Sequence, residues 1–337
     1  MRFGPVPTAA AAGAILAHSV ALPGGRLRKG RVLSTADIAA LRAAGLAEVI
    51  VARPDPGDVG EDAAAAAIAA ALVPDPEGQG LRLSEAFTGR VNLIAEAPGV
   101  ILLDPERLLA LNRIDPMLTL ATLPPFQQVG SGQMAATVKI IAYALPGAHL
   151  ERARAVLAGP PAIRLARPAH ATARLIVTEI DRGAGAKGVE AVRARLAALN
   201  ITMGDPVMVP HRAAPLAEAL READEDLLLI LTGSATSDLE DVAPQALRLA
   251  GGQVDRFGMP VDPGNLLFLG ALGPRPVIGL PGCARSPALN GADWVLARVA
   301  CGLPVSLDDI AAMGVGGLLK EIPTRPQPRD RRRRREE

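Results

Sequence analysis

The chain has 337 residues, of which 49% are apolar and only 2% aromatic, and its formal net charge is +1. This length is typical of two or three domains, and the apolar content suffices for cores built from Ala, Leu, Val and Ile. The near-neutral charge argues against a nucleic-acid-binding protein or one held on an acidic membrane, and the few aromatic residues argue against base stacking.

The cysteines, the histidines and the length of the apolar runs further limit the class of protein. Cys283 and Cys301 form no CxxC motif, so neither a disulfide scaffold nor a zinc site is indicated. The longest apolar run, 63–73, is shorter than the ~20 residues of a spanning helix, and we identify no signal peptide. We therefore expect a soluble cytoplasmic protein. The histidines are scattered and are expected at ordinary surface or partly buried positions: His18, His149, His170 and His211.

Residues 1–72 are predicted to form a small α+β module. A strand with a tight turn at Gly30 comes first, and a helix follows, capped by Ser34 or Thr35 and ended by Gly45. The remaining predicted elements of this module are a strand at 47–52, a loop at 54–61 and an Ala-rich helix at 62–72.

Residues 73–170 are predicted to form a mixed α/β segment. It begins with a loop at 74–80, and two strands follow around a turn at Pro98-Gly99. Pro105 is expected in the first turn of a short helix, and a Gly-led strand pair lies near 130–145. A connection with one short helix ends the segment, and we place the main domain boundary near residue 170.

Residues 171–322 alternate between strand and helix patterns, which predicts βαβ units. The expected fold class is α/β, with an open, mainly parallel sheet and helices on both faces. The last helix is expected to begin at Ser286 and to bury Leu289 together with Ala292, Val295, Leu296 and Val299. The tail 323–337 lacks apolar residues and contains the run Arg331–Arg335, so we expect it to be disordered.

The stretch "LTGSATSDLEDVAPQAL" at 231–247 follows a buried strand pattern and is longer than a simple turn requires. Ligands bind at the carboxyl ends of strands in open α/β sheets, where Gly233 would admit a ligand close to the backbone. Ser234, Thr236 and Ser237 could hydrogen-bond a polar heterocycle or a phosphate. Asp241 opens the next helix, so it is either a functional carboxylate or an N-cap.

Two further loops precede or follow predicted strands. Pro263-Gly264 forms a turn flanked by Asp262 and Asn265, and its composition alone favours an ordinary turn. Pro281-Gly282 ends a strand, and Ser286 follows as a helix cap or as part of an anion-binding loop.

A glycine-rich loop, "RGAGAKG", also follows a strand. Gly183, Gly185 and Gly188 satisfy the G-x-G-x-x-G spacing of dinucleotide-binding loops. The confirming acid should end the next strand, yet the nearest candidate, Asp205, precedes it. We interpret the loop as flexible or phosphate-tolerant.

These motifs together resemble those of the molybdopterin adenylyltransferases and molybdopterin molybdotransferases. "TGSATSDLEDVAPQA" is similar to their T-G-G-x-[GS]…D loop, with Thr232, Gly233 and Asp241 in register. "PVDPGN" is similar to K-P-G-K, and "VIGLPGCARS" to V-F-G-L-P-G-N-P-V-S with Ser286 in register. The leading and middle segments also look like those of this superfamily, so the resemblance covers nearly everything except the tail.

The resemblance implies a molybdopterin-binding fold in the C-terminal domain. It implies that the protein binds molybdopterin or adenylylated molybdopterin in molybdenum cofactor biosynthesis or handling, as a homodimer and alongside other enzymes of that synthesis. Asp241 would position Mg²⁺ or a nucleophilic oxygen in a transferase. The implied ligand-binding residues are Thr232, Gly233, Ser234, Thr236, Pro263, Gly264, Asn265, Pro281, Gly282 and Ser286.

The chain departs from the pattern where an anion would be held. Asp262 and Asn265 replace both lysines of K-P-G-K, which removes two positive charges that could pair with molybdate. Lys187 and Arg285 are the nearest candidates to replace them. We expect pterin binding with little molybdate insertion. The alternatives are a non-catalytic carrier or sensor, and a nicotinamide-dependent oxidoreductase using 183–188.

Overall fold

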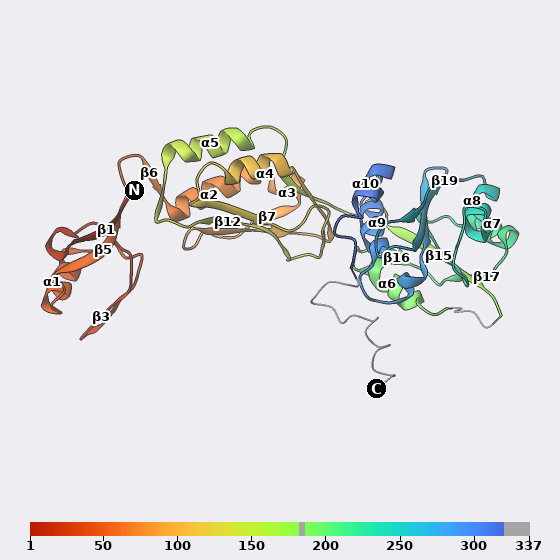
Figure 1. The fold of residues 1–337 in the computed structure, drawn as a ribbon, viewed down its shortest axis with the longest axis horizontal. Coiled ribbons are helices and arrows are strands. Elements are labelled where there is room, and N and C mark those ends of the chain that lie inside the picture. The colour runs from red at the N-terminus through yellow and green to blue at the C-terminus, as the bar shows by residue number, and fades with distance from the viewer. Residues whose placement is uncertain (182–185, 320–337) are drawn as a thin grey trace. The chain divides into compact units, whose positions relative to one another are not determined.

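The computed structural model describes residues 1–181 and 186–319, and its fold is mixed α/β (Figure 1). The chain divides into two compact units. No helix within those two ranges is long and apolar enough to cross a membrane. The first unit comprises Met1–Glu96, Ile101–Pro125 and Ser131–Leu165, and the second comprises Ala97–Val100, Phe126–Gly130 and the chain from Ala166.

The first unit begins with a three-stranded antiparallel sheet, ordered β1-β5-β2, that packs on helix α1. Ser34 caps α1 through a capping box, because its hydroxyl accepts the Asp37 N–H while the Asp37 carboxylate accepts the Ser34 N–H. The elements here are β1 (Arg2–Pro7), a 3-10 turn η1 (Thr8–Ala10), β2 (Ile15–Leu16), β3 (Val20–Leu22), β4 (Gly25–Leu27), α1 (Thr35–Ala43) and β5 (Glu48–Arg53).

Local sequence signals predicted the helix of this segment well and one strand poorly. The cap at Ser34 and the strand after Gly45 are confirmed. The strand predicted around Gly30 is reduced to a turn and a single bridge between Val32 and Ile15. Residues 30–33 do hydrogen-bond to residues 13–16, for example from the Leu33 N–H to the Ala14 carbonyl at 2.9 Å, but this pairing is too short to form a strand.

The rest of the first unit is a four-stranded antiparallel sheet, ordered β10-β12-β8-β7, with α2 packed against β8 and β12. Ile68 of α2 is buried together with Leu93 and Val138 of those strands. The elements of residues 58–166, of which β11 belongs to the second unit, are β6 (Asp58–Gly60), α2 (Glu61–Leu72), α3 (Pro76–Gln79), β7 (Leu81–Leu83), β8 (Arg90–Ala95), β9 (Gly99–Leu103), α4 (Pro105–Asn112), β10 (Leu118–Thr122), β11 (Gln128–Val129), β12 (Met134–Ile140), β13 (Ala144–Pro146), α5 (Gly147–Leu157) and β14 (Ile163–Ala166).

Several strand partners in this region differ from the prediction. The two strands around Pro98-Gly99 exist but join different sheets, β8 beside β12 and β9 beside β11. The predicted loop 54–61 contains β6, which pairs with β13, and the predicted loop 74–80 contains α3. These pairings join residues far apart in the chain, which local patterns do not reveal.

The second unit is built on a seven-stranded mixed sheet, ordered β16-β15-β18-β21-β20-β19, with β17 also beside β15. Strand β15 runs parallel to β16, β17 and β18, and β18 runs parallel to β21, whereas β20 is antiparallel to both β21 and β19. The strands are β15 (Thr172–Glu179), β16 (Thr202–Met203), β17 (Val207–Pro210), β18 (Leu227–Leu231), β19 (Gln253–Met259), β20 (Asn265–Leu272) and β21 (Arg275–Leu280).

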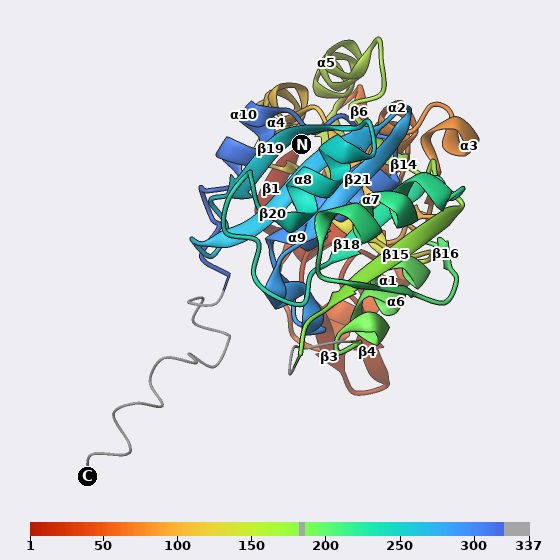
Figure 2. The same cartoon turned by 90° about the vertical axis from the view of Figure 1, so that its right-hand side faces the viewer.

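Helices cover both faces of this sheet, as Figure 1 shows, and Figure 2 looks onto it with α7 and α8 in front. Strand β18 is buried at every residue, which explains why it reads as a continuous apolar run. Leu220 of α7 and Leu247 of α8 pack in one core cluster with Phe268. The helices are α6 (Val189–Ala197), α7 (Ala213–Glu222), α8 (Val242–Leu249), α9 (Gly291–Ala300) and α10 (Leu307–Ala312), with a 3-10 turn η2 (Gly282–Arg285).

The start of α9 corrects a prediction. The helix begins at Gly291 rather than at Ser286, because Asn290 and Asp293 form a capping box. Leu289, predicted to face inward, precedes the helix and is exposed. The other predicted inward positions are buried or nearly so: Ala292, Val295, Leu296 and Val299.

Asp226 joins the starts of β15 and β18, and its charge should make the second unit sensitive to acid. Its Oδ2 accepts the N–H groups of Ala171 and Thr172, both at 2.9 Å, and the Thr172 hydroxyl at 3.1 Å. The Thr172 N–H first, and then the Ala171 N–H and the Thr172 hydroxyl, lower the pKa of Asp226 below its ordinary value of 3.8. Folding therefore favours the ionised form.

We expect the contribution of Asp226 to be complete above its unfolded pKa near 3.8 and to disappear as the pH falls through the lower folded value. Asp226→Asn should thus destabilise the protein at pH 6 and much less at pH 3. Urea denaturation at both pH values measures this, with the exposed Asp224→Asn as control. An equal effect of Asp226→Asn at both pH values would show that its charge contributes nothing.

Candidate functional site

The carboxyl ends of four parallel strands, β15, β17, β18 and β21, meet at one edge of the seven-stranded sheet. The chain passes from β15 to β17 on one side and then to β18 on the other. Open α/β sheets commonly bind ligands beside such a reversal of strand order. β20 starts at the same edge, since Phe268 pairs with Gly279 and Asn265 lies three residues nearer the carboxyl end of β21. The loops 232–241, 262–265 and 281–286 therefore lie along one edge.

The loop after β18 is held against the end of β15. A Cβ on Gly233 would lie only 2.7 Å from the carbonyl oxygen of Thr178, so this approach requires glycine. The Thr232 hydroxyl donates to the carbonyl of Ser234 at 2.6 Å and lies 3.5 Å from the buried Thr236 hydroxyl. Ser234 itself is exposed at the edge.

Asp241 is the N-cap of α8, and both of its carboxylate oxygens accept backbone N–H groups. Oδ1 accepts the Val242 N–H at 2.7 Å, and Oδ2 accepts the Ser237 N–H at 2.8 Å. It thereby folds the loop back onto the helix. Across residues 1–181 and 186–319 no group of three or more His, Cys, Asp or Glu side chains could hold a metal ion. Mg²⁺ is usually held by one or two carboxylates together with water and phosphate oxygens, so Asp241 could supply one ligand of such a site.

The turn before β20 has left-handed backbone at Asp262 (φ 42°) and Gly264 (φ 95°), with Pro263 exposed between them. The N–H of Asp262 donates to the carbonyl of Gly317 at 2.7 Å. Asn265 is only 5% exposed, and its Oδ1 accepts the Leu267 N–H at 3.2 Å. The sequence placed Asn265 as a flank of a surface turn, and the structure places its side chain inside.

The loop after β21 contains Pro281, which is buried, and the turn η2. A Cβ at Gly282 would meet no atom within 4 Å, so this glycine leaves open space at the edge. The Ser286 hydroxyl accepts the Ala288 N–H at 3.2 Å. Ser286 thus shapes the loop that leads to α9 instead of capping the helix.

Arg285 connects this loop to its neighbours. Its guanidinium donates to the carbonyl oxygen of Thr232 at 2.7 Å and also to that of Lys187. Burial lowers the pKa of Arg285, yet an arginine remains charged. The backbone of Arg285 packs against Gly188, where a Cβ would lie 2.6 Å from the Arg285 Cα. Arg285 thereby brings a positive charge to the loop after β18.

Arg195 of α6 is a second arginine at this loop, and our sequence analysis did not identify it. It pairs with Asp293 and donates to the carbonyls of Ala284 at 2.8 Å and Ser286 at 2.7 Å. The one signal in the sequence is that Arg195 lies next to the apolar positions Val192 and Leu196, which α6 buries.

Thr178, which the sequence did not single out, and His211, which it predicted at an ordinary surface or partly buried position, also lie at this edge. The Thr178 hydroxyl accepts the Gly233 N–H at 2.9 Å and lies 2.8 Å from Nδ1 of His211. Nε2 of the same ring lies 3.4 Å from the Ser234 hydroxyl. The one signal in the sequence is that His211 directly follows the strand pattern "PVMVP".

The glycine-rich loop is described only in part. Gly183 and Gly185 lie outside the described residues, as does the predicted tail 323–337 with Arg331–Arg335. Gly188 is the N-cap of α6 with φ 96°. Asp205 is exposed and lies between β16 and β17, not at the end of a strand.

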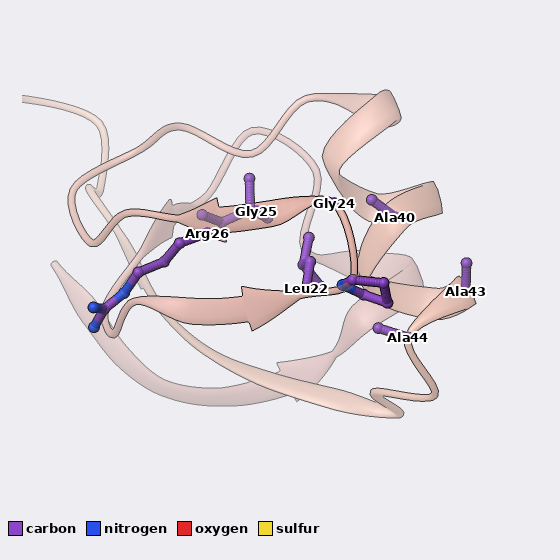
Figure 3. Close-up of a pocket in the computed structure, with 9 residues that line it drawn as sticks. Leu22, Gly24, Gly25, Arg26, Ala40, Ala43 and Ala44 are labelled. Atoms are coloured by element: carbon purple, nitrogen blue, oxygen red, sulfur yellow. The ribbon is translucent and has the colours of Figure 1, made fainter.

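A shallow cavity of about 460 Å³ lies in the first unit, between the β3–β4 hairpin and α1 (Figure 3). Arg26 is the one charged side chain on its wall, which is otherwise made of small and aliphatic residues such as Leu22, Gly24 and Ala40. Binding sites usually combine an apolar wall with several converging polar groups. The sheet edge has such groups, and this cavity does not.

Comparison with known families gives one partial match. A model described as a domain of unknown function (DUF8806) matches residues 5–53. This segment holds the first sheet and α1 and lies outside the unit that carries the sheet edge. No curated protein matches the chain.

Proposed function

We propose that the second unit is a molybdopterin-binding domain, which takes molybdopterin or its adenylylated form during the synthesis or handling of molybdenum cofactor. The observation that carries the proposal is that the loops 232–241, 262–265 and 281–286 lie along one sheet edge. These are the loops whose motifs resemble those of molybdopterin adenylyltransferases and molybdotransferases. Three motifs in order and in register, at a strand-order reversal, support this ligand over others.

The chemistry of the edge suits a pterin that carries a phosphate. The pterin ring presents amide-like donors and acceptors, which hydroxyls and backbone N–H groups near Gly233 and Ser234 would pair. The phosphate would pair with a cation, and Arg285 supplies one. Gly282 leaves space for a ligand to approach the backbone. In this proposal the protein acts as a homodimer, in contact with other enzymes of the same synthesis.

Substitution of Gly233 tests this placement. Gly233→Val should force the loop away from Thr178, because the added Cβ would lie 2.7 Å from a backbone carbonyl oxygen. We expect a stability loss of about 1–3 kcal/mol from this overpacking. Molybdopterin affinity should fall more than tenfold in the folded variant, measured by fluorescence titration of the full chain. Gly282→Ala, which meets no neighbour, is the matched control and should keep its stability. Unchanged affinity in Gly233→Val would place the ligand elsewhere.

The charge at the turn before β20 leads to a second prediction, that molybdate insertion is slow. A charge-assisted hydrogen bond contributes roughly 1.5–3 kcal/mol, so replacing lysines by Asp262 and Asn265 weakens anion capture by at least tenfold. Asp262→Lys should raise the rate of insertion into adenylylated molybdopterin at low molybdate. Asp262→Asn removes the negative charge alone and should have a smaller effect. Wild-type turnover equal to that of an ordinary molybdotransferase would contradict the prediction.

A non-catalytic carrier or sensor is the second candidate, and one observation favours it. Both oxygens of Asp241 already accept backbone N–H groups, so this carboxylate serves as a helix cap in the structure. A carrier would bind molybdopterin and release it unchanged, whereas a transferase would return a modified product. Analysis of the pterin released after incubation with molybdate and Mg²⁺ separates the two.

The nicotinamide-dependent alternative rests on the loop 183–188. Asp205 does not occupy the strand end where a ribose-binding acid belongs. A change in NAD(P)H fluorescence on mixing with the protein would support this alternative.

A further inference from the structure

The buried hydroxyl of Thr178 links the ends of three strands through its hydrogen bonds. Thr178 is the last residue but one of β15, and its side chain has no exposed surface. It contacts the Gly233 N–H after β18 and the His211 ring after β17. Ser234 completes the chain of contacts on the far side of the ring.

The positions of the hydrogen atoms in this series of hydrogen bonds follow from the need of each buried polar group for a hydrogen-bond partner. The Gly233 N–H can only donate, so the Thr178 oxygen accepts there. The Thr178 hydroxyl hydrogen then needs an acceptor, and within the described residues His211 Nδ1, at 2.8 Å, is the atom in reach. A neutral imidazole whose Nδ1 accepts must carry its proton on Nε2. Thr178 thereby selects one tautomer of His211.

The selected tautomer directs an N–H toward the open side of the edge. Nε2 lies 3.4 Å from the hydroxyl of Ser234, which is exposed, and the ring itself is half-buried. A contact of 3.4 Å is long for a hydrogen bond, so this donor is only weakly used within the protein. Because Nε2 carries a proton, His211 does not act as a base toward the Ser234 hydroxyl in this state.

We propose that His211 is a ligand-binding residue whose Nε2–H donates to an acceptor oxygen of the bound molecule, a carbonyl or phosphate oxygen, and that Thr178 is its positioning residue. The contact between His211 and the ligand rests on the proposed function, since the bound molecule is taken to be molybdopterin. The tautomer of His211 follows from the geometry of the protein alone.

Nitrogen NMR of the ¹⁵N-histidine-labelled full chain tests the tautomer without ligand. At pH 8, where imidazole is ordinarily neutral, His211 should show an unprotonated Nδ1 and a protonated Nε2. Thr178→Ser, which keeps the hydroxyl, should preserve this pattern, and Thr178→Val should change it to a tautomer mixture. A protonated Nδ1 in the wild type, or an unchanged pattern in Thr178→Val, overturns the assignment.

Molybdopterin binding tests the ligand contact with two amide variants that differ only in side-chain length. His211→Gln places an amide N–H close to the Nε2 position and should retain affinity within about threefold. His211→Asn reaches only the Nδ1 position and should bind roughly tenfold more weakly, the effect of one lost hydrogen bond. Equal affinities of the two variants overturn the contact. If the wild type binds no molybdopterin, the proposed function and the contact fall together, while the nitrogen spectrum still decides the tautomer.

Discussion

Replacing Gly279 by valine should lower the free energy of unfolding of the second unit by about 3 kcal/mol, because strands β20 and β21 meet there without room for a side chain. A Cβ at Gly279 would lie 1.9 Å from Cε1 of Phe268, its partner across the strands. That ring is only 1% exposed and lies in the core cluster with residues of α7 and α8. Urea denaturation followed by circular dichroism measures the effect.

The reason for this loss can be checked with a compensating substitution. Phe268→Leu shortens the side chain that meets the new Cβ, so Gly279→Ala should cost less in the Phe268→Leu background than in the wild type. Equal losses in both backgrounds would show that the glycine is needed for some other reason. An unchanged denaturation midpoint in Gly279→Val would contradict the packing itself.

Replacing Arg195 by methionine should cost about 3–5 kcal/mol, the usual effect of removing one partner of a buried ion pair. The side chains of Arg195 and Asp293 are 13% and 14% exposed. The substitution leaves Asp293 without its cation and removes the donors to the carbonyls of Ala284 and Ser286. We therefore expect the loop 281–290 to loosen and molybdopterin affinity to fall as well.

A double-mutant cycle separates the ion pair from the carbonyl contacts of Arg195. Asp293→Asn keeps an acceptor for the cap of α9 but removes the charge. If the pair matters, the double variant Arg195→Met/Asp293→Asn should lose clearly less stability than the sum of the single variants. Additive losses would show that the carbonyl contacts alone account for the effect of Arg195.

Local signals in the sequence located most elements of the second unit. Asp241 was expected at the start of a helix, and it is the N-cap of α8. The run 227–231 was expected to be a buried strand, and every residue of β18 is buried. Ser286 was mistaken for the start of α9, because a serine before an apolar pattern looks like a helix cap. The residue that caps the helix is Asn290, directly before Gly291.

Long-range contacts explain what the sequence did not reveal. Thr178 and His211 are separated by a helix and two strands along the chain, and they meet only because β17 pairs beside β15. The contact of Arg285 with the Thr232 carbonyl likewise depends on β21 lying next to β18. Strand order is a global property of the sheet, so motif spacing located the loops but not the residues that join them.

Binding of molybdopterin to the wild-type chain of 337 residues is the measurement that tests the central claim most directly. Gel filtration of the mixture, followed by oxidation and pterin fluorescence, gives the amount bound, with the Gly233→Val variant as reference. The account predicts saturable binding of about one molybdopterin per chain and clearly less in the variant. Failure of the folded wild type to retain molybdopterin at any concentration, or equal retention by the variant, would contradict it.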